Sequence, residues 1–146
     1  METVLLIWCG WLIADLASGV FHIATDYGYN IPRFVKAFED HHRCPNDLCF
    51  NPIYLLVGIP IICATWPSML GISLGVGLSV SQLSHQMAHR QCPYFVRWLQ
   101  WCRILMHPKH HIQHHRGNHN RSYCALCGWN DWWMDWVVAR FDRSKI

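Results

Sequence analysis

Apolar positions gather in long, charge-free stretches separated by short polar segments. From Leu48 to His89 the chain contains no Asp, Glu, Lys or Arg. A single helix of that length would be about twice the ~30 Å hydrocarbon thickness of a bilayer. Because Pro67 cannot continue a helix that precedes it, the pattern predicts two antiparallel membrane spans, at residues 48–65 and 67–83.

A third apolar stretch lies close to the start of the chain. Residues 4–23 contain one charged residue, Asp15, and no basic segment precedes them, so they are predicted to span the membrane as well. A carboxylate inside a span is costly, and Asp15 is therefore expected to be bonded internally, either for structure or beneath a functional site. Proline and glycine give two further expectations: Pro60 kinks the span 48–65, and the glycines of the span 67–83 allow close helix contact, namely Gly71, Gly75 and Gly77.

Two later segments mix aromatic and charged residues in the manner of helices that lie in the plane of a membrane surface. They cover residues 94–106 and 129–141, and the second holds four tryptophans. The whole pattern predicts an all-α integral membrane protein with a single domain, residues 1–146. This protein is expected to have about three transmembrane helices in addition to these interfacial helices.

Composition supports a membrane protein. Hydrophobic residues make up 52% of the chain, and Asp, Glu, Lys and Arg only 14%, against roughly 25% in an average soluble domain. The net charge of +3 is too small to indicate a nucleic-acid-binding protein. Three spans place residues 26–47 and 90–146 on one side, and these hold all twelve Lys and Arg residues. The positive-inside rule predicts that this side is cytoplasmic. We expect the membrane to be the endoplasmic reticulum or an equivalent membrane.

The eleven histidines fall on or beside that same face. Side chains four residues apart share one face of a helix, which is a spacing typical of metal ligands. Three pairs have this spacing, namely His22 and Asp26, His85 and His89, and His111 and His115. Further donors are the adjacent His41 and His42, and His114.

These donors exceed the three or four ligands of a mononuclear zinc site, so they favour two metal ions. Imidazoles with a carboxylate and no thiolate suit iron better than a structural zinc. Two irons at a membrane surface are suited to O2-dependent attack on an unactivated C–H bond. Three histidines have other expected roles: His107 is a bystander, and His110 and His119 are further ligands or orient the ligands from outside.

Two other interpretations use the same residues. Cys124 and Cys127 form a C-x-x-C pair that Cys44 and Cys49 could complete as a zinc site, but this leaves the histidines unexplained. A metal transporter or metal sensor of the membrane is the non-enzyme alternative. A transporter is expected to hold its ligands near the bilayer midplane, whereas these histidines lie at the ends of the predicted spans and beyond them.

The residues resemble a known family, the Kua-type lipid desaturases, which act on ether lipids (the plasmanylethanolamine desaturases) and on plastid phosphatidylglycerol. The resemblance runs in order from about Asp15 to Asp135 and includes the pair Leu99-Gln100. It rests on five motifs: Asp15-Leu-Ala-Ser-Gly-Val-Phe-His22 with Asp26, Phe38-Glu-Asp-His41-His42-Arg-Cys-Pro45, Ser84-His85-Gln-Met-Ala-His89, Lys109-His110-His111-Ile-Gln-His114-His115, and His119 with Tyr123, Cys124, Gly128 and Trp129.

The resemblance implies an integral membrane oxidoreductase that desaturates a chain of an intact phospholipid with two Fe ions and O2. It also implies an external electron donor, such as a cytochrome b5-like or ferredoxin-like protein. The implied iron ligands are His22, His41, His42, His85, His89, His111, His114 and His115, with Asp26 as a further ligand or an orienting group. The motifs around His111 and Tyr123 look closest to the ether-lipid branch, so a vinyl ether, as in plasmalogens, is the expected product. An acyl-chain desaturase and a related di-iron hydroxylase are the alternatives within this chemistry.

Overall fold

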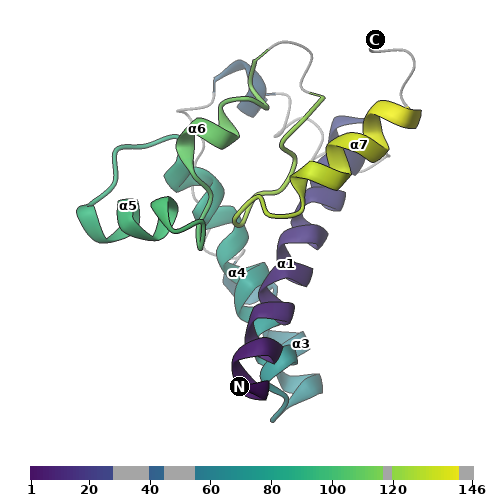
Figure 1. The fold of residues 1–146 in the computed structure, drawn as a ribbon, viewed down its shortest axis with the longest axis vertical. Coiled ribbons are helices and arrows are strands. Elements are labelled where there is room, and N and C mark those ends of the chain that lie inside the picture. The colour runs from purple at the N-terminus through teal and green to yellow at the C-terminus, as the bar shows by residue number, and fades with distance from the viewer. Residues whose placement is uncertain (28–39, 45–54, 117–119, 142–146) are drawn as a thin grey trace.

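The computed structural model describes residues 1–27, 40–44, 55–116 and 120–141, and these residues form helices and loops without a strand (Figure 1). The predicted all-α fold is confirmed for this part of the chain. The helices are α1 (Glu2–Asp26), α3 (Ile59–Thr65), α4 (Met69–Ala88), α5 (Tyr94–Trp101), α6 (Pro108–His111) and α7 (Asp131–Phe141). Residues 40–43 add one short helical turn.

Helices α1 and α4 pack against each other and form the long axis of the molecule (Figure 1). Both run in the same direction, so their carboxyl ends lie at the same end of the molecule, that of α4 beside α6 and that of α1 beside α7. Helix α3 packs against the first half of α4. This arrangement brings the histidines of two distant segments, at the ends of α1 and α4, to one place.

One helix of the described part, α1, is long and apolar enough to cross a membrane. It contains the predicted span 4–23. Helix α4 contains most of the predicted span 67–83 and continues five residues beyond it, to Ala88. The continuous span predicted at 48–65 is not seen, because its described part is helical in α3 only from Ile59. Its first residues, up to 54, lie outside the described residues.

Proline decides the limits of α3 and α4. Pro60 was expected to kink a helix, but it lies in the first turn of α3, where its missing N–H is not needed. Pro67 separates α3 from α4 as predicted. Ser68 then caps α4 by accepting a hydrogen bond from the backbone N–H of Gly71.

Glycines allow the close packing of α4 with its neighbours, as predicted. A Cβ atom at Gly77 would lie 2.6 Å from the Cβ of Ala14 on α1, and one at Gly75 would lie 2.7 Å from the carbonyl oxygen of Gly58. Gly10 of α1 approaches the backbone of Leu70 in the same way. A larger side chain at Gly77 or Gly10 would separate α1 from α4, the two helices that carry histidines of the site.

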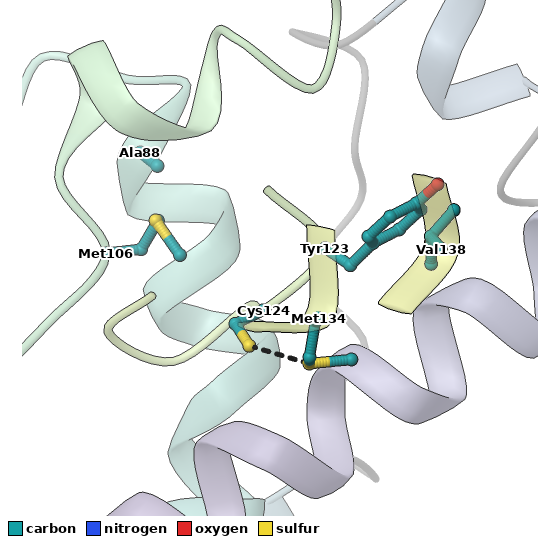
Figure 2. Close-up of a cluster of buried hydrophobic side chains, with 6 residues drawn as sticks. All are labelled: Ala88, Met106, Tyr123, Cys124, Met134 and Val138. Carbon is teal, nitrogen blue, oxygen red and sulfur yellow. Dashed lines mark hydrogen bonds between the residues drawn. The ribbon is translucent and has the colours of Figure 1, made fainter. Parts of the chain in front are cut away.

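The two predicted interfacial segments are helical in part, as α5 and α7. Large aromatic side chains are exposed on both or just before them, among them Trp98 and Trp101 on α5 and Trp132 and Trp136 on α7. Helix α7 covers the end of α1 through a small core, shown in Figure 2, whose members are Ala88, Met106, Tyr123, Cys124, Met134 and Val138. This core fixes the segment 121–130, which contacts the histidines.

Candidate metal centre

Four segments deliver side chains to the end of the α1–α4 pair. Helix α1 ends with His22 and Asp26, and α4 ends with His85 followed by His89. The helical turn 40–43 supplies His41 and His42. Helix α6 and the turn after it supply His111, His114 and His115.

These nine side chains form two groups, in each of which one possible ligand atom per residue lies within 4.8 Å of all the others. The five-histidine group contains His41, His85, His89, His111 and His115. The carboxylate group contains His22, Asp26, His42 and His114. The eight histidines and Asp26 named from the sequence are therefore brought together, and the helical turn 40–43 contributes to both groups.

The distances between ring nitrogens suit coordination to shared metal ions. The Nε2 atoms of His41 and His85 are 2.9 Å apart, and those of His111 and His115 are 3.1 Å apart. In the carboxylate group, the Nε2 atoms of His42 and His114 are 2.8 Å apart. Two nitrogens about 2.1 Å from one metal, at right angles, are separated by about 3.0 Å. Each close pair also lies within one group.

Among the described residues, the five-histidine group contains one buried Nε2 without a hydrogen-bond partner, that of His89. A buried polar atom without a partner costs about 1–3 kcal/mol, so this nitrogen points to a ligand that it would share with the close Nε2 pairs of the group. The Nδ1 atoms of His41, His85 and His111 point away from their Nε2 atoms and would not bind the same metal. Five imidazoles exceed the four ligands of a structural zinc site and suit a metal with higher coordination, such as iron.

Asp26 is the one carboxylate of the two groups. Its oxygens lie 3.8 Å from Nε2 of His22, 3.8 Å from Nε2 of His42 and 3.5 Å from Nε2 of His114. The two groups therefore differ in charge, since the five-histidine group has only neutral donors. A metal in the carboxylate group would be partly neutralised, and one in the five-histidine group would keep its full positive charge.

Burial keeps the imidazoles neutral, which metal binding requires. Burial and the neighbouring His115 and His89 lower the pKa of His41 to about 2. Burial also lowers the pKa of His89 to about 4. Burial and the adjacent His85 lower the pKa of His111 well below its usual value.

Backbone carbonyls orient two histidines of the carboxylate group, and sequence reasoning missed them. Nδ1 of His22 lies 2.8 Å from the carbonyl oxygen of Tyr123, and Nδ1 of His114 lies 2.8 Å from that of Arg121. A hydrogen bond at Nδ1 fixes the tautomer and turns Nε2 toward the metal. Every residue has a carbonyl, so no sequence signal marks these two.

Asp15 holds the end of segment 121–130, whose first residues supply these carbonyls. Its buried carboxylate accepts hydrogen bonds from the backbone N–H groups of Cys127, Gly128 and Asn130, at 2.8, 2.9 and 3.2 Å. The side chain of Asn130 donates a fourth, at 3.0 Å. The structure thus gives Asp15 internal hydrogen bonds, as expected, in a role that positions the outer part of the site.

His110 lies outside both groups. Its Nε2 is 2.7 Å from Oδ2 of Asp131, whose other oxygen accepts from the backbone N–H of Cys124 at 2.8 Å. Gly128 has a φ of +75°, and a Cβ there would lie 2.9 Å from the His110 ring. His110 therefore braces the segment beside the ligands.

The remaining histidines and the cysteines lie elsewhere. His107 is in neither group and caps α6 by accepting from the backbone N–H of Lys109. His119 and Cys49 lie outside the described residues. No cysteine of the described part belongs to either group, and burial raises the pKa of the Cys124 and Cys127 thiols, which disfavours the thiolates that zinc needs.

Comparisons with known proteins give independent information. A family model described as a lipid desaturase domain matches residues 11–141. Fatty acid desaturase 4-like 2, chloroplastic, of Arabidopsis thaliana is 32% identical over 152 residues, which cover 89% of this chain and 54% of that protein. Plasmanylethanolamine desaturase of Myxococcus xanthus is 27% identical over 145 residues, which cover 82% and 51%.

A third relative, plasmanylethanolamine desaturase 1 of Mus musculus, is 24% identical over 151 residues, covering 82% of this chain and 55% of that protein. The chain thus spans about half the length of the curated relatives it matches. No solved structure matches the chain significantly.

Proposed function

The chain belongs to the lipid desaturase family, and from this premise we propose that it is an O2-dependent di-iron enzyme that desaturates a chain of a membrane phospholipid. The observation that carries the proposal is the pair of ligand groups at the end of the apolar α1–α4 pair. Two irons held there would supply the reduction of O2 and the removal of two hydrogen atoms from adjacent carbons.

The chain's own residues have three tasks in this proposal. The eight histidines donate neutral nitrogens, so the positive charge on the metals is offset by few anionic ligands, with Asp26 as the one carboxylate of the two groups. The carbonyls of Arg121 and Tyr123 keep Nε2 of His114 and His22 directed inward. The helices α1 and α4 present the site to the bilayer.

Two substrate classes fit this proposal. The motif resemblance favours an ether phospholipid and a vinyl ether product. The identities support an acyl chain, since a relative named as a fatty acid desaturase is 32% identical, against 27% and 24% for the two named plasmanylethanolamine desaturases. We therefore carry acyl-chain desaturation as the second candidate.

The proposal includes a membrane orientation and an electron donor. The chain has no Lys or Arg before Asp26, and the twelve that follow lie in the segments on the histidine side of the membrane. This distribution supports a cytoplasmic location of that side. O2 reduction with removal of two substrate hydrogens leaves two electrons to be supplied from outside. We expect a small redox protein of the cytochrome b5 or ferredoxin type to deliver them.

Lipid mass spectrometry tests the reaction. Cells that lack plasmanylethanolamine desaturase are made to express the protein, and their phospholipids are compared with those of cells expressing the His42→Ala variant. Loss of two hydrogens from an ether chain, with acid-labile product, supports the first candidate, and the same loss from an acyl chain supports the second. Gain of one oxygen would indicate a hydroxylase, and unchanged lipids from an iron-loaded protein with a working donor would contradict the proposal.

A further inference from the structure

A pocket of about 310 Å³ lies between α1 and α4, directly below the histidines. His22 and His85 both line it, and they belong to different ligand groups. A molecule in this pocket would therefore contact both halves of the proposed metal centre.

The pocket follows one face of α4. Its α4 residues, from Leu78 to His85, recur at the three- and four-residue spacing of a single helix face. The seven residue-to-residue steps from Leu78 to His85 rise about 10 Å along the helix axis. An extended chain that advances about 1.2 Å per bond would need about eight bonds to cover that distance.

The walls suit hydrocarbon. Ala17 and Phe21 of α1, Val57 and Leu78 contribute apolar surface. Phe21 is 42% exposed and Val57 is 52% exposed. Both belong to the part of the molecule that we place in the bilayer. A lipid chain can therefore enter from the membrane between them.

The polar groups of the pocket walls are compatible with a bound hydrocarbon chain. The hydroxyls of Ser18 and Ser81 donate to carbonyls of their own helices, those of Asp15 and Leu78, at 2.7 and 2.8 Å. Gln82 lies one helical turn before His85, toward the end at which the oxygen-bearing end of a phospholipid chain would lie.

We propose that this pocket binds the hydrocarbon chain of the phospholipid substrate, with the reacting carbons beside His22 and His85 and at least about eight further carbons extending along α4 to Leu78. The inference rests on the proposed function. The histidines lie at the surface end of the helices, so the glycerol end of the lipid lies on their side and the methyl end points into the bilayer. Chains with fewer than about eight carbons beyond the reacting bond should bind poorly.

Photo-crosslinking tests the pocket without metal or turnover. The metal-free full-length protein is placed in phosphatidylcholine vesicles containing a small fraction of phosphatidylglycerol with a diazirine midway along one chain. After irradiation, adducts are located by mass spectrometry. We expect them to concentrate on the peptides containing residues 17–21 and 78–82, and to fall when unlabelled phosphatidylglycerol is added in excess.

Substitutions that fill the pocket provide the matched comparison. Ala17 is exposed, so Ala17→Phe blocks the pocket mouth without displacing the core, and it should cut adduct formation at these peptides at least fivefold. Val20→Phe enlarges an exposed residue of the same helix outside the pocket lining, and should leave labelling within twofold. Leu78→Phe, with Val76→Phe as its control, repeats the comparison on α4.

Three results would overturn the inference. Labelling could spread evenly over the exposed residues of α1 and ignore Ala17→Phe. Adducts in the pocket could resist excess competing lipid, which would indicate a structural lipid. Lipids with short chains could also compete as well as long ones. Failure of the proposed function has a different signature, namely normal pocket labelling in a protein whose iron-loaded form makes no desaturated product.

Discussion

Nδ1 of His22 hydrogen-bonds the backbone carbonyl of Tyr123 at 2.8 Å, although the two residues are 101 positions apart in the chain. His22 ends the first apolar helix, and Tyr123 lies in the loop before α7. This bond joins the membrane-facing part of the molecule to its C-terminal segment. The orientation of a proposed metal ligand therefore depends on how well that loop is held.

Asp15→Asn tests this dependence. The substitution keeps the shape of the side chain but replaces a carboxylate oxygen that accepts backbone N–H bonds with an N–H donor. Hydrogen bonds to a charged group contribute about 1.5–3 kcal/mol each, so we expect a clear fall in melting temperature. Iron content should also fall, because segment 121–130, which carries the orienting carbonyls at its start, loses the hydrogen bonds that hold its end at residues 127–130.

The control for this variant is Glu2→Gln, an exposed carboxylate on the same helix. It should change neither the melting temperature nor the iron content. If Asp15→Asn melts earlier but binds iron with unchanged stoichiometry and affinity, Asp15 supports the fold alone, and its proposed link to the metal site is wrong.

Histidine substitutions test the membership of the five-histidine group. His85→Ala removes a proposed ligand that is 1% exposed, and should reduce the iron content of the purified protein to one ion per chain or less. His107→Ala is the matched control, since this residue caps α6 and belongs to neither group. Metal analysis after anaerobic iron loading measures both. Equal loss in the two variants would mean that general destabilisation, not ligation, explains the result.

Asp26→Asn separates the two groups. The amide has nearly the size of the carboxylate but no charge, so the carboxylate group should lose affinity while the five-histidine group keeps its donors. We expect about one iron per chain and a changed Mössbauer spectrum, in which one of two iron signals is lost. Loss of both signals together would show that the two groups bind metal only as a unit.

The pH dependence of stability gives a test at Asp135. Burial raises the pKa of this carboxyl from 3.8 to about 6, while its Oδ1 accepts from the backbone N–H of Ser122. Between these two values the folded chain binds more protons than the unfolded chain. The contribution of Asp135 to stability is therefore full below pH 4 and is lost as the pH rises to 6.

Comparison of the wild-type protein with Asp135→Asn isolates this contribution. From pH 4 to pH 7 the free energy of unfolding of the wild type should fall by about 1 kcal/mol relative to that of Asp135→Asn. This value allows for the partial solvent exposure of the carboxyl. Thermal melting of the metal-free proteins at several pH values measures it. A pH-independent difference would contradict the raised pKa.

The sequence predicted most of the apolar helices, and it predicted the residues that the structure brings together in the two groups, because both depend on local patterns. Residues such as His85 and His89 reveal their shared helix face through a spacing of four. The division of the ligands was not predictable, because His41 and His42 are adjacent and yet face different groups. That division depends on how the turn 40–43 sits against α4 and α6, which is a tertiary property.

Two other features escaped sequence reasoning for physical reasons. The carbonyls of Arg121 and Tyr123 are backbone atoms and carry no residue-type signal. Pro60 was misassigned because proline is compatible with both a kink and a first turn, and only the start of α3 at Ile59 decides between them. By contrast, the charge of Asp15 inside an apolar stretch predicted that its side chain is hydrogen-bonded internally, although the sequence did not identify its partners.

The iron content of the purified protein tests the central claim most directly. The protein is loaded with ferrous iron under anaerobic conditions in the presence of competing zinc, separated from free metal, and analysed for both metals per chain. Two ligand groups with eight histidines and one carboxylate predict about two irons per chain and little zinc. One metal per chain, or stoichiometric zinc with iron absent, would contradict the di-iron account.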